Sequence, residues 1–189
     1  MRLRFEKAAR LYDVCGRSVD VKHGAVSAPG AVDAAIGLAG WMVLCFAAAA
    51  IGARYRPGAW YAGLRKPAWN PPNWLFAPVW TLLYATMAVA AWLVWRDVGL
   101  SPETLLFVVQ LVLNAAWTWL FFGLKRPGLA LADIAALWLA ILATLLAFWS
   151  VRPLAGMLLA PYLAWVTFAA ALNAALWRLN RAQGRPSGE

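Results

Sequence analysis

Five long stretches without a charged residue or a histidine constrain the fold of this 189-residue chain more than any other feature. They cover Ala34–Ala53, Pro67–Trp95, Thr104–Leu124, Ile134–Val151 and Pro153–Trp177. A helix needs about 20 mostly apolar residues to cross a bilayer, with a range of about 17–25. The stretch from Ile134 is the shortest, and it gains length when it starts near Leu129 and includes Asp133. Each stretch therefore predicts one membrane-spanning helix.

The composition favours membrane helices over the buried helices of a soluble domain. Charged residues make up 13% of the chain, whereas a soluble domain carries about 25%. We predict an all-α membrane protein, a five-transmembrane-helix bundle with a long Pro/Trp-rich loop between helices 1 and 2. The expected spans are about 33–53, 78–95, 103–122, 129–149 and 154–177. The later turns are short, so sequential helices should be antiparallel neighbours.

Polar segments flank this bundle at both ends of the chain. Residues 1–31 form a polar N-terminal extension, residues 32–180 the five-helix domain, and residues 181–189 a polar tail. The extension lacks the apolar core of a secretory signal. Phe5, Ala8, Ala9 and Tyr12 have helical spacing in it, so it is either a short helix on the membrane surface or a disordered tail.

The net charge of +9 comes from basic residues that flank the apolar stretches, which indicates membrane lipid as a partner and no nucleic acid. With five spans, the long loop and the C-terminus share one side, and basic residues gather there. They are Arg54, Arg56, Arg65, Lys66, Lys125, Arg126, Arg178, Arg181 and Arg185. The other side has Arg96, Arg152 and the N-terminal extension. Positive-inside counting predicts that the long loop and the C-terminus are cytoplasmic.

The residues that would support metal or hydrolytic chemistry are missing from the predicted spans. His23, the lone histidine, and Cys15 lie in the extension, while Cys45 lies inside the first span. This arrangement predicts no metal site and no disulfide framework. No pair of carboxylates is placed for hydrolysis, so any catalysis would depend on aromatic residues or on chemistry supplied by a ligand or light.

The loop Trp60–Trp80, WYAGLRKPAWNPPNWLFAPVW, holds four tryptophans and four prolines. Pro67, Pro71 and Pro72 prevent a continuous helix because each lacks an N–H and restrains the residue before it. An aromatic, proline-broken loop beside membrane helices is typical of a lid or a recognition surface.

Polar and aromatic residues recur at helical spacing on three predicted spans. The sets are Trp80, Tyr84 and Met87; Gln110, Asn114 and Trp117; and Pro161, Trp165, Ala169 and Asn173. Facing inward, they would form a pocket with aromatic walls and a few amide and hydroxyl groups. The alternative for the two amides of the middle set is hydrogen bonding between helices.

Two features of the fourth span leave alternatives open. Asp133 is the only acid within a predicted span, and it either pairs with the basic loop of Lys125 and Arg126 or relays protons. A stripe of small residues allows close approach of another helix, with packing inside the bundle favoured over a homodimer contact. The stripe consists of Ala132, Ala136, Ala140 and Thr144.

Three segments in this order resemble the TspO/MBR family, which comprises bacterial tryptophan-rich sensory proteins and mitochondrial translocator proteins, or peripheral-type benzodiazepine receptors. They are WYAGLRKPAWNPPNWLFAPVWTLLYATM at 60–87, QLVLNAAWTWLFFG at 110–123 and PYLAWVTFAAALNAALWRLN at 161–180. The resemblance covers about residues 33–180. It implies a five-helix bundle, often homodimeric, in the cytoplasmic membrane of a bacterium or the mitochondrial outer membrane of a eukaryote.

The resemblance also implies a function, namely binding of porphyrins such as protoporphyrin IX and other flat hydrophobic ligands in tetrapyrrole transport or regulation. No further cofactor is required. Carried over by position, the ligand-binding residues are Phe76, Ala77, Val79, Trp80, Asn114, Trp117, Ala132, Trp165, Ala169 and Leu172, and the helical stripe adds Tyr84. Arg65 and Lys66 would meet either the ligand carboxylates or lipid headgroups.

Two alternatives to a receptor remain. Some bacterial members resemble light- and oxygen-dependent enzymes that degrade protoporphyrin, and their two catalytic tryptophans match Trp80 and Trp165. A passive small-molecule transporter is the other. The sterol-recognition stretch of animal members expects a tyrosine where Ala174 stands before Arg178, so sterol binding is not predicted.

Overall fold

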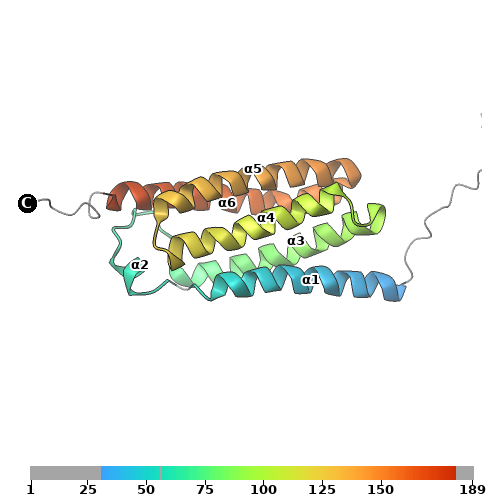
Figure 1. The fold of residues 1–189 in the computed structure, drawn as a ribbon, viewed down its shortest axis with the longest axis horizontal. Coiled ribbons are helices and arrows are strands. Elements are labelled where there is room, and N and C mark those ends of the chain that lie inside the picture. Colours follow the sequence, from blue (N-terminus) through green and yellow to red (C-terminus); the bar gives the residue numbers. More distant parts are fainter. Residues whose placement is uncertain (1–30, 56, 182–189) are drawn as a thin grey trace, which may run out of the picture.

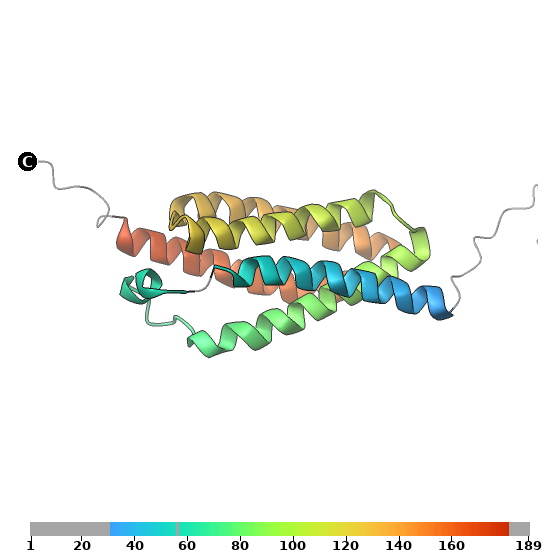
Figure 2. The same cartoon turned by 60° about the horizontal axis from the view of Figure 1, so that its bottom comes forward.

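The structure is a computed structural model that describes residues 31–55 and 57–181. The predicted polar extension and tail lie outside these residues except for their innermost positions, as does the surface helix considered around Phe5–Tyr12. Figures 1 and 2 show an elongated bundle of long helices, and each helix runs in roughly the opposite direction to the one before it in the chain.

Five helices in the described residues are long and apolar enough to cross a membrane, which confirms the predicted architecture. They are α1 (Ala31–Ala53), α3 (Phe76–Val98), α4 (Pro102–Thr118) with its π-helical continuation η2 (Trp119–Gly123), α5 (Pro127–Val151) and α6 (Pro153–Asn180). The long loop holds the short helix α2 (Ala59–Gly63) and the 3-10 turn η1 (Asn73–Leu75). The second span starts earlier than predicted because Pro78 lies in the first turn of α3, where a missing N–H costs little.

Sequence signals at the helix starts account for the short turns. The predicted start at Ser101 is confirmed, because the Ser101 backbone N–H donates to Thr104 Oγ1 at 2.9 Å and Pro102 occupies the first helical position. Pro127 and Pro153 open α5 and α6 in the same way. A single residue, Arg152, separates α5 from α6 and makes an ion pair with Asp97 at 3.3 Å.

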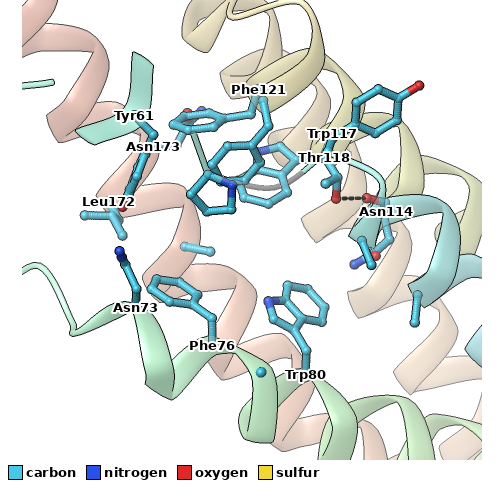
Figure 3. Close-up of a pocket in the computed structure, with 18 of the residues that line it drawn as sticks. Tyr61, Asn73, Phe76, Trp80, Asn114, Trp117, Thr118, Phe121, Leu172 and Asn173 are labelled. Atoms are coloured by element: carbon cyan, nitrogen blue, oxygen red, sulfur yellow. Dashed lines mark hydrogen bonds between the residues drawn. The ribbon is translucent and has the colours of Figure 1, made fainter. Parts of the chain in front are cut away.

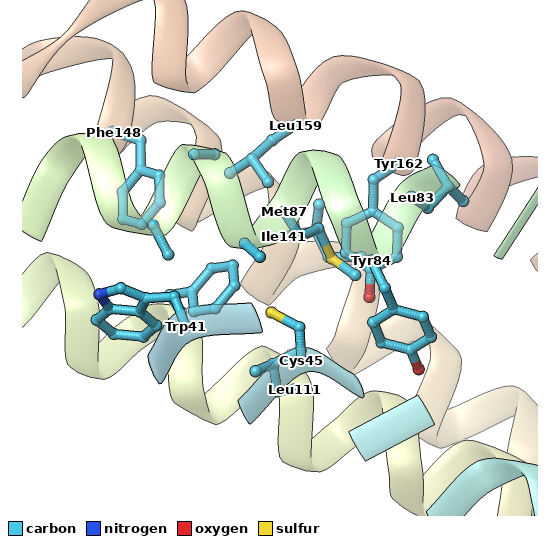
Figure 4. Close-up of a cluster of buried hydrophobic side chains, with 14 of the residues drawn as sticks. Trp41, Cys45, Leu83, Tyr84, Met87, Leu111, Ile141, Phe148, Leu159 and Tyr162 are labelled. Atoms are coloured by element: carbon cyan, nitrogen blue, oxygen red, sulfur yellow. The ribbon is translucent and has the colours of Figure 1, made fainter. Parts of the chain in front are cut away.

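The main core lies along the bundle axis and combines large and very small side chains. Figure 4 shows that Met87, Leu159 and Tyr162 belong to the same buried cluster as Trp41 and Cys45 of α1. On α3, Ala88, Ala90 and Ala91 are fully buried, which lets neighbouring helices approach closely.

For each of the two α5 features, the structure does not show one of the alternatives considered, and the other stays a prediction. Ala132 and Ala136 are exposed, so the first half of the small-residue stripe does not pack inside the bundle, and α5 instead buries larger side chains. These are Ile134, Leu137, Ile141 and Phe148. Asp133 is half-buried, its Oδ2 has no hydrogen-bond partner among the described residues, and neither Lys125 nor Arg126 pairs with it.

Candidate ligand cavity

A cavity of about 440 Å³ lies at the end of the bundle that carries the long loop. Residues of α1, α3, α4, η2 and α6 form its walls, and Tyr61 of α2 covers its end. Figure 3 shows Phe76 and Trp80 of α3 facing Trp117 and Phe121 across the open space. Its volume lies within the range of about 300–1,000 Å³ that is usual for small-molecule sites.

A chain of buried hydrogen bonds forms the inner end of the cavity and joins three helices. Tyr84 Oη donates to Asn114 Oδ1 at 2.6 Å, and Asn114 Nδ2 donates to Tyr162 Oη at 2.9 Å. Tyr162 Oη in turn donates to Gln110 Oε1 at 3.0 Å. Tyr84 and Asn114 also line the cavity, so Asn114 combines both roles considered from the sequence. Gln110 does not line the cavity, and its side chain links α4 to α6 by accepting the hydrogen bond from Tyr162.

Aromatic rings make up much of the cavity wall. The Trp80 ring lies 5.6 Å from Tyr84 and 6.2 Å from Tyr162, measured between ring centroids. On the facing side, the Trp117 and Phe121 rings stack with centroids 5.5 Å apart. Contacts of this kind hold each ring in place, so the wall offers ring faces and edges in fixed positions.

The π-helical turn η2 places two phenylalanines between the cavity and the loop. Phe121 is only 2% exposed, and its ring lies 6.3 Å from that of Tyr61, while Phe122 lies 5.6 Å from Tyr61. A π-turn widens the helix and shifts the side chains that follow. Here it directs Phe121 and Phe122 toward α2.

We call residues 57–75 the loop cap, because they cover the end of the cavity and are fastened to the helices. The Arg65 backbone N–H donates to Asn180 Oδ1, and Asn180 Nδ2 donates to the Arg65 carbonyl, both at 3.0 Å. Trp69 contacts Phe168 with ring centroids 5.8 Å apart. The loop therefore lies where a lid would lie, and its role as a lid or a recognition surface stays a prediction.

Tyr61 is the centre of the loop cap. It is 4% exposed, and its hydroxyl donates to Asn70 Oδ1 at 3.2 Å. Lys66 Nζ lies 4.8 Å from the centroid of the Tyr61 ring and donates to the carbonyls of Ala62 and Leu64. Burial raises the pKa of the Tyr61 hydroxyl, and the hydrogen bond to Asn70 lowers it by less. The neutral phenol is thus the form that the closed cap favours.

Most residues predicted to bind a ligand line this one cavity. They are Phe76, Ala77, Trp80, Tyr84, Asn114, Trp117, Ala169 and Leu172. Val79, Ala132 and Trp165 do not line it. Val79 packs against the main core, and Ala132 is exposed on α5, which contributes no lining residue. Trp165 contacts Phe76, which does line the cavity, with ring centroids 5.9 Å apart.

Arg65 and Lys66 also lie outside the cavity wall, in the loop cap. The Lys66 ammonium group donates hydrogen bonds to the carbonyls of Ala62 and Leu64. Sequence reasoning missed the contribution of α1, of the cap tyrosine and of η2. These lining residues are Phe46, Ala49, Gly52, Tyr61, Phe121 and Phe122. The α1 residues belong to an apolar helix without a polar stripe, so nothing marked their inward face.

Two residues of the wall carry buried polar atoms without a hydrogen-bond partner in the described part of the chain. These atoms are Trp117 Nε1, a donor, and Asn173 Oδ1, an acceptor. Buried polar groups in proteins are rarely left unpaired. The wall therefore keeps one donor and one acceptor beside its aromatic surface.

Together, the bundle and the cavity define a multi-pass integral membrane protein with an aromatic small-molecule cavity beneath a loop cap. Residues 39–178 match the TspO/MBR family, and this chain belongs to that family. It is 45% identical over 147 residues to "Protein CrtK" of Rhodobacter capsulatus, covering 74% of this chain and 90% of that one.

Bacterial and animal proteins are both similar to the chain. It is 44% identical to the "Translocator protein" of Homo sapiens over 138 residues, which cover 69% of this chain and 82% of the human one. It is 43% identical to the "Tryptophan-rich protein TspO" of Chlorobaculum tepidum over 144 residues, which cover 72% and 91%.

Proposed function

We propose that this protein is a membrane receptor that binds porphyrins, such as protoporphyrin IX, or related flat hydrophobic molecules in its capped cavity. The observation that carries the proposal is the arrangement of Trp80, Phe76, Trp117 and Phe121 around one space of about 440 Å³. A porphyrin is a flat apolar plate, and aromatic rings pack well against its faces and edges.

The polar groups of the cavity are few and suit a largely apolar ligand. Asn114 and Tyr84 already satisfy one another, so they position the inner wall without demanding a polar partner. The free donor of Trp117 and the free acceptor of Asn173 could each pair with a ligand polar group after a small side-chain rotation. The ligand carboxylates would point toward the loop cap, where Arg65 and Lys66 lie.

Binding is favoured over degradation by the position of the second tryptophan proposed for catalysis. Trp80 lines the cavity, whereas Trp165 does not line it and contacts Phe76, which does. A ligand in this cavity would therefore contact Trp80 directly, and Trp165 is not part of the wall that it meets. The same site would serve a protein that regulates tetrapyrrole levels or one that passively transports the bound tetrapyrrole.

Titration of the purified protein with protoporphyrin IX in lipid nanodiscs tests this function. Quenching of tryptophan fluorescence should saturate at one ligand per chain. Trp80→Ala should raise the Kd about tenfold, which corresponds to about 1.4 kcal/mol, because it removes one ring of the wall. Trp149→Ala is the matched control, since Trp149 is exposed on α5. Equal affinities in the wild type and the Trp80 variant would contradict the proposal.

We further propose that the loop cap faces the cytoplasm. Among the described residues, the capped end carries Arg54, Arg65, Lys66, Lys125, Arg126, Arg178 and Arg181. The opposite end carries Arg96 and Arg152, and Asp97 pairs with the latter. This asymmetry supports the orientation by the positive-inside rule. A C-terminal reporter that is active only in the cytoplasm should be active, and an inactive reporter would reverse the orientation.

A further inference from the structure

The helices α1 and α3 are fastened to each other at the end of the bundle away from the cavity. Trp92 Nε1 donates to the Ala34 carbonyl at 2.7 Å. Gly37 lies against the Trp95 ring so closely that an added Cβ would overlap it. These contacts fix the first half of α1 against the second half of α3.

Toward the loop cap the same two helices diverge, as Figure 2 shows. The cavity is lined there by Phe46, Ala49 and Gly52 of α1 and by Ala77 and Thr81 of α3. Three of these residues also reach the outer surface, because Phe46 is 41% exposed and Ala77 and Thr81 are exposed. Residues that belong to both the cavity wall and the outer surface mark a side opening between α1 and α3.

The side opening faces the acyl chains of the bilayer. Phe46 and Thr81 both lie within helices that are long and apolar enough to span the membrane. At a rise of about 1.5 Å per residue, Phe46 lies about 10 Å along α1 from its end at Ala53. The opening therefore extends below the headgroups into the hydrocarbon layer, which is about 30 Å thick.

The loop cap obstructs the route from water. The paired hydrogen bonds between Arg65 and Asn180 fasten the loop cap to α6, and Trp69 fastens it to Phe168. Tyr61 lies beneath the cap with 4% of its surface exposed, and the lining residues Pro57 and Asn73 are exposed parts of the cavity wall at this end. A ligand from the aqueous side would have to pass Pro57 and Asn73 or break these contacts, whereas a ligand in the bilayer meets mainly small side chains.

We propose that the cavity is loaded sideways from the bilayer through the side opening, and that the Phe46 ring is the gate. The inference rests on the proposed function in that the ligand is a membrane-dissolved flat hydrophobic molecule. Phe46 is the only large side chain among the three residues that define the opening, the others being Ala77 and Thr81. Its rotation would widen or narrow the passage while the loop cap stays closed.

The rate of ligand binding in nanodiscs tests the gate, with protoporphyrin IX added to the lipid beforehand. Phe46→Trp should slow association and dissociation several-fold together, and Phe46→Ala should speed both. Val43→Trp and Val43→Ala are matched controls, since Val43 is 69% exposed on the same helix and does not line the cavity. Asn180→Ala, which loosens the loop cap, should leave association unchanged. Faster association in Asn180→Ala with unchanged rates in both Phe46 variants would overturn the proposal.

A labelling experiment tests the opening without any porphyrin, so failure of the proposed function is distinguished from failure of lateral loading. Ala169 lines the cavity from α6, opposite the opening. In a Cys15→Ser, Cys45→Ala background, Ala169→Cys should react with a membrane-soluble pyrene maleimide and not with a membrane-impermeant thiosulfonate. Phe46→Trp should slow this labelling and Val43→Trp should not. Faster reaction with the impermeant reagent would place the route through the loop cap and overturn the inference.

Discussion

Asn114 holds the inner wall of the cavity together through its side-chain amide. It accepts a hydrogen bond from Tyr84 and donates one to Tyr162, both buried. The helical spacing of Gln110, Asn114 and Trp117 was enough to predict an inward-facing amide. It could not show whether the amide binds a ligand or a neighbouring helix, because spacing along one helix says nothing about the residues that face it.

Replacing Asn114 by leucine should destabilise the folded protein. The hydroxyls of Tyr84 and Tyr162 would each lose a partner inside the membrane domain, at a cost of about 1–3 kcal/mol. Unfolding in detergent, followed by circular dichroism, measures the change. Val112→Ala is the control, because Val112 is 62% exposed on the same helix. An unchanged unfolding midpoint for Asn114→Leu would show that the hydrogen-bond chain contributes nothing to stability.

Tyr61 makes closure of the loop cap dependent on pH at alkaline values. Burial raises its pKa in the closed cap, while an opened cap would return the phenol to its ordinary pKa of about 10. The open form therefore loses its proton first, and the closed form is progressively disfavoured as the pH rises above that value. Below it, both forms are protonated and the equilibrium does not change.

Limited proteolysis of the loop cap, compared between neutral pH and a pH above 10, measures this effect. Cleavage should increase at the higher pH in the wild type. Tyr61→Phe keeps the ring and removes the proton, so its cleavage should be independent of pH in this range. The same alkaline increase in both proteins would assign the effect to other groups.

At the scale of secondary structure, the transmembrane helices could be predicted because each is a long uncharged stretch with a proline or a capping residue near its start. The π-turn η2 could not, since no residue between Trp119 and Gly123 distinguishes it from a continued α-helix. For the same reason Phe121 and Phe122 were not assigned to the cavity, although both lie within the family motif. The loop tyrosine was missed because its side chain is placed by contacts with η2.

The hairpin of α5 and α6 depends on a glycine. A Cβ on Gly156 would lie 2.8 Å from the Trp149 Cβ and 2.9 Å from its Cα, which is closer than atoms can approach. Gly156→Ala should therefore force the helices apart and destabilise the bundle by about 1–3 kcal/mol. Thermal unfolding in detergent measures the change.

Gly40→Ala is the matched control for this prediction. No atom lies within 4 Å of an added Cβ at Gly40, and alanine favours a helix over glycine by up to about 1 kcal/mol. This variant should be as stable as the wild type or more so. Equal losses of stability in both variants would contradict the close packing of α5 and α6.

At the scale of the whole molecule, the resemblance to a family and the physical arrangement supplied different parts of the site. The family motifs located seven of the lining residues on α3, α4 and α6, and helical spacing added Tyr84. The motifs also carried over Val79, Ala132 and Trp165, which do not line the cavity. The contribution of α1 and the side opening follow only from how the helices diverge in space, a property that no single helix encodes.

The position of a bound ligand tests the central claim most directly. Crystals grown in lipid with zinc protoporphyrin IX, measured at the zinc absorption edge, would place the metal of the ligand by its anomalous scattering. The account predicts one peak per chain within the cavity bounded by Trp80, Trp117 and Phe121, beneath Tyr61. A peak on the outer surface of the bundle, with the cavity free of ligand density, would contradict it.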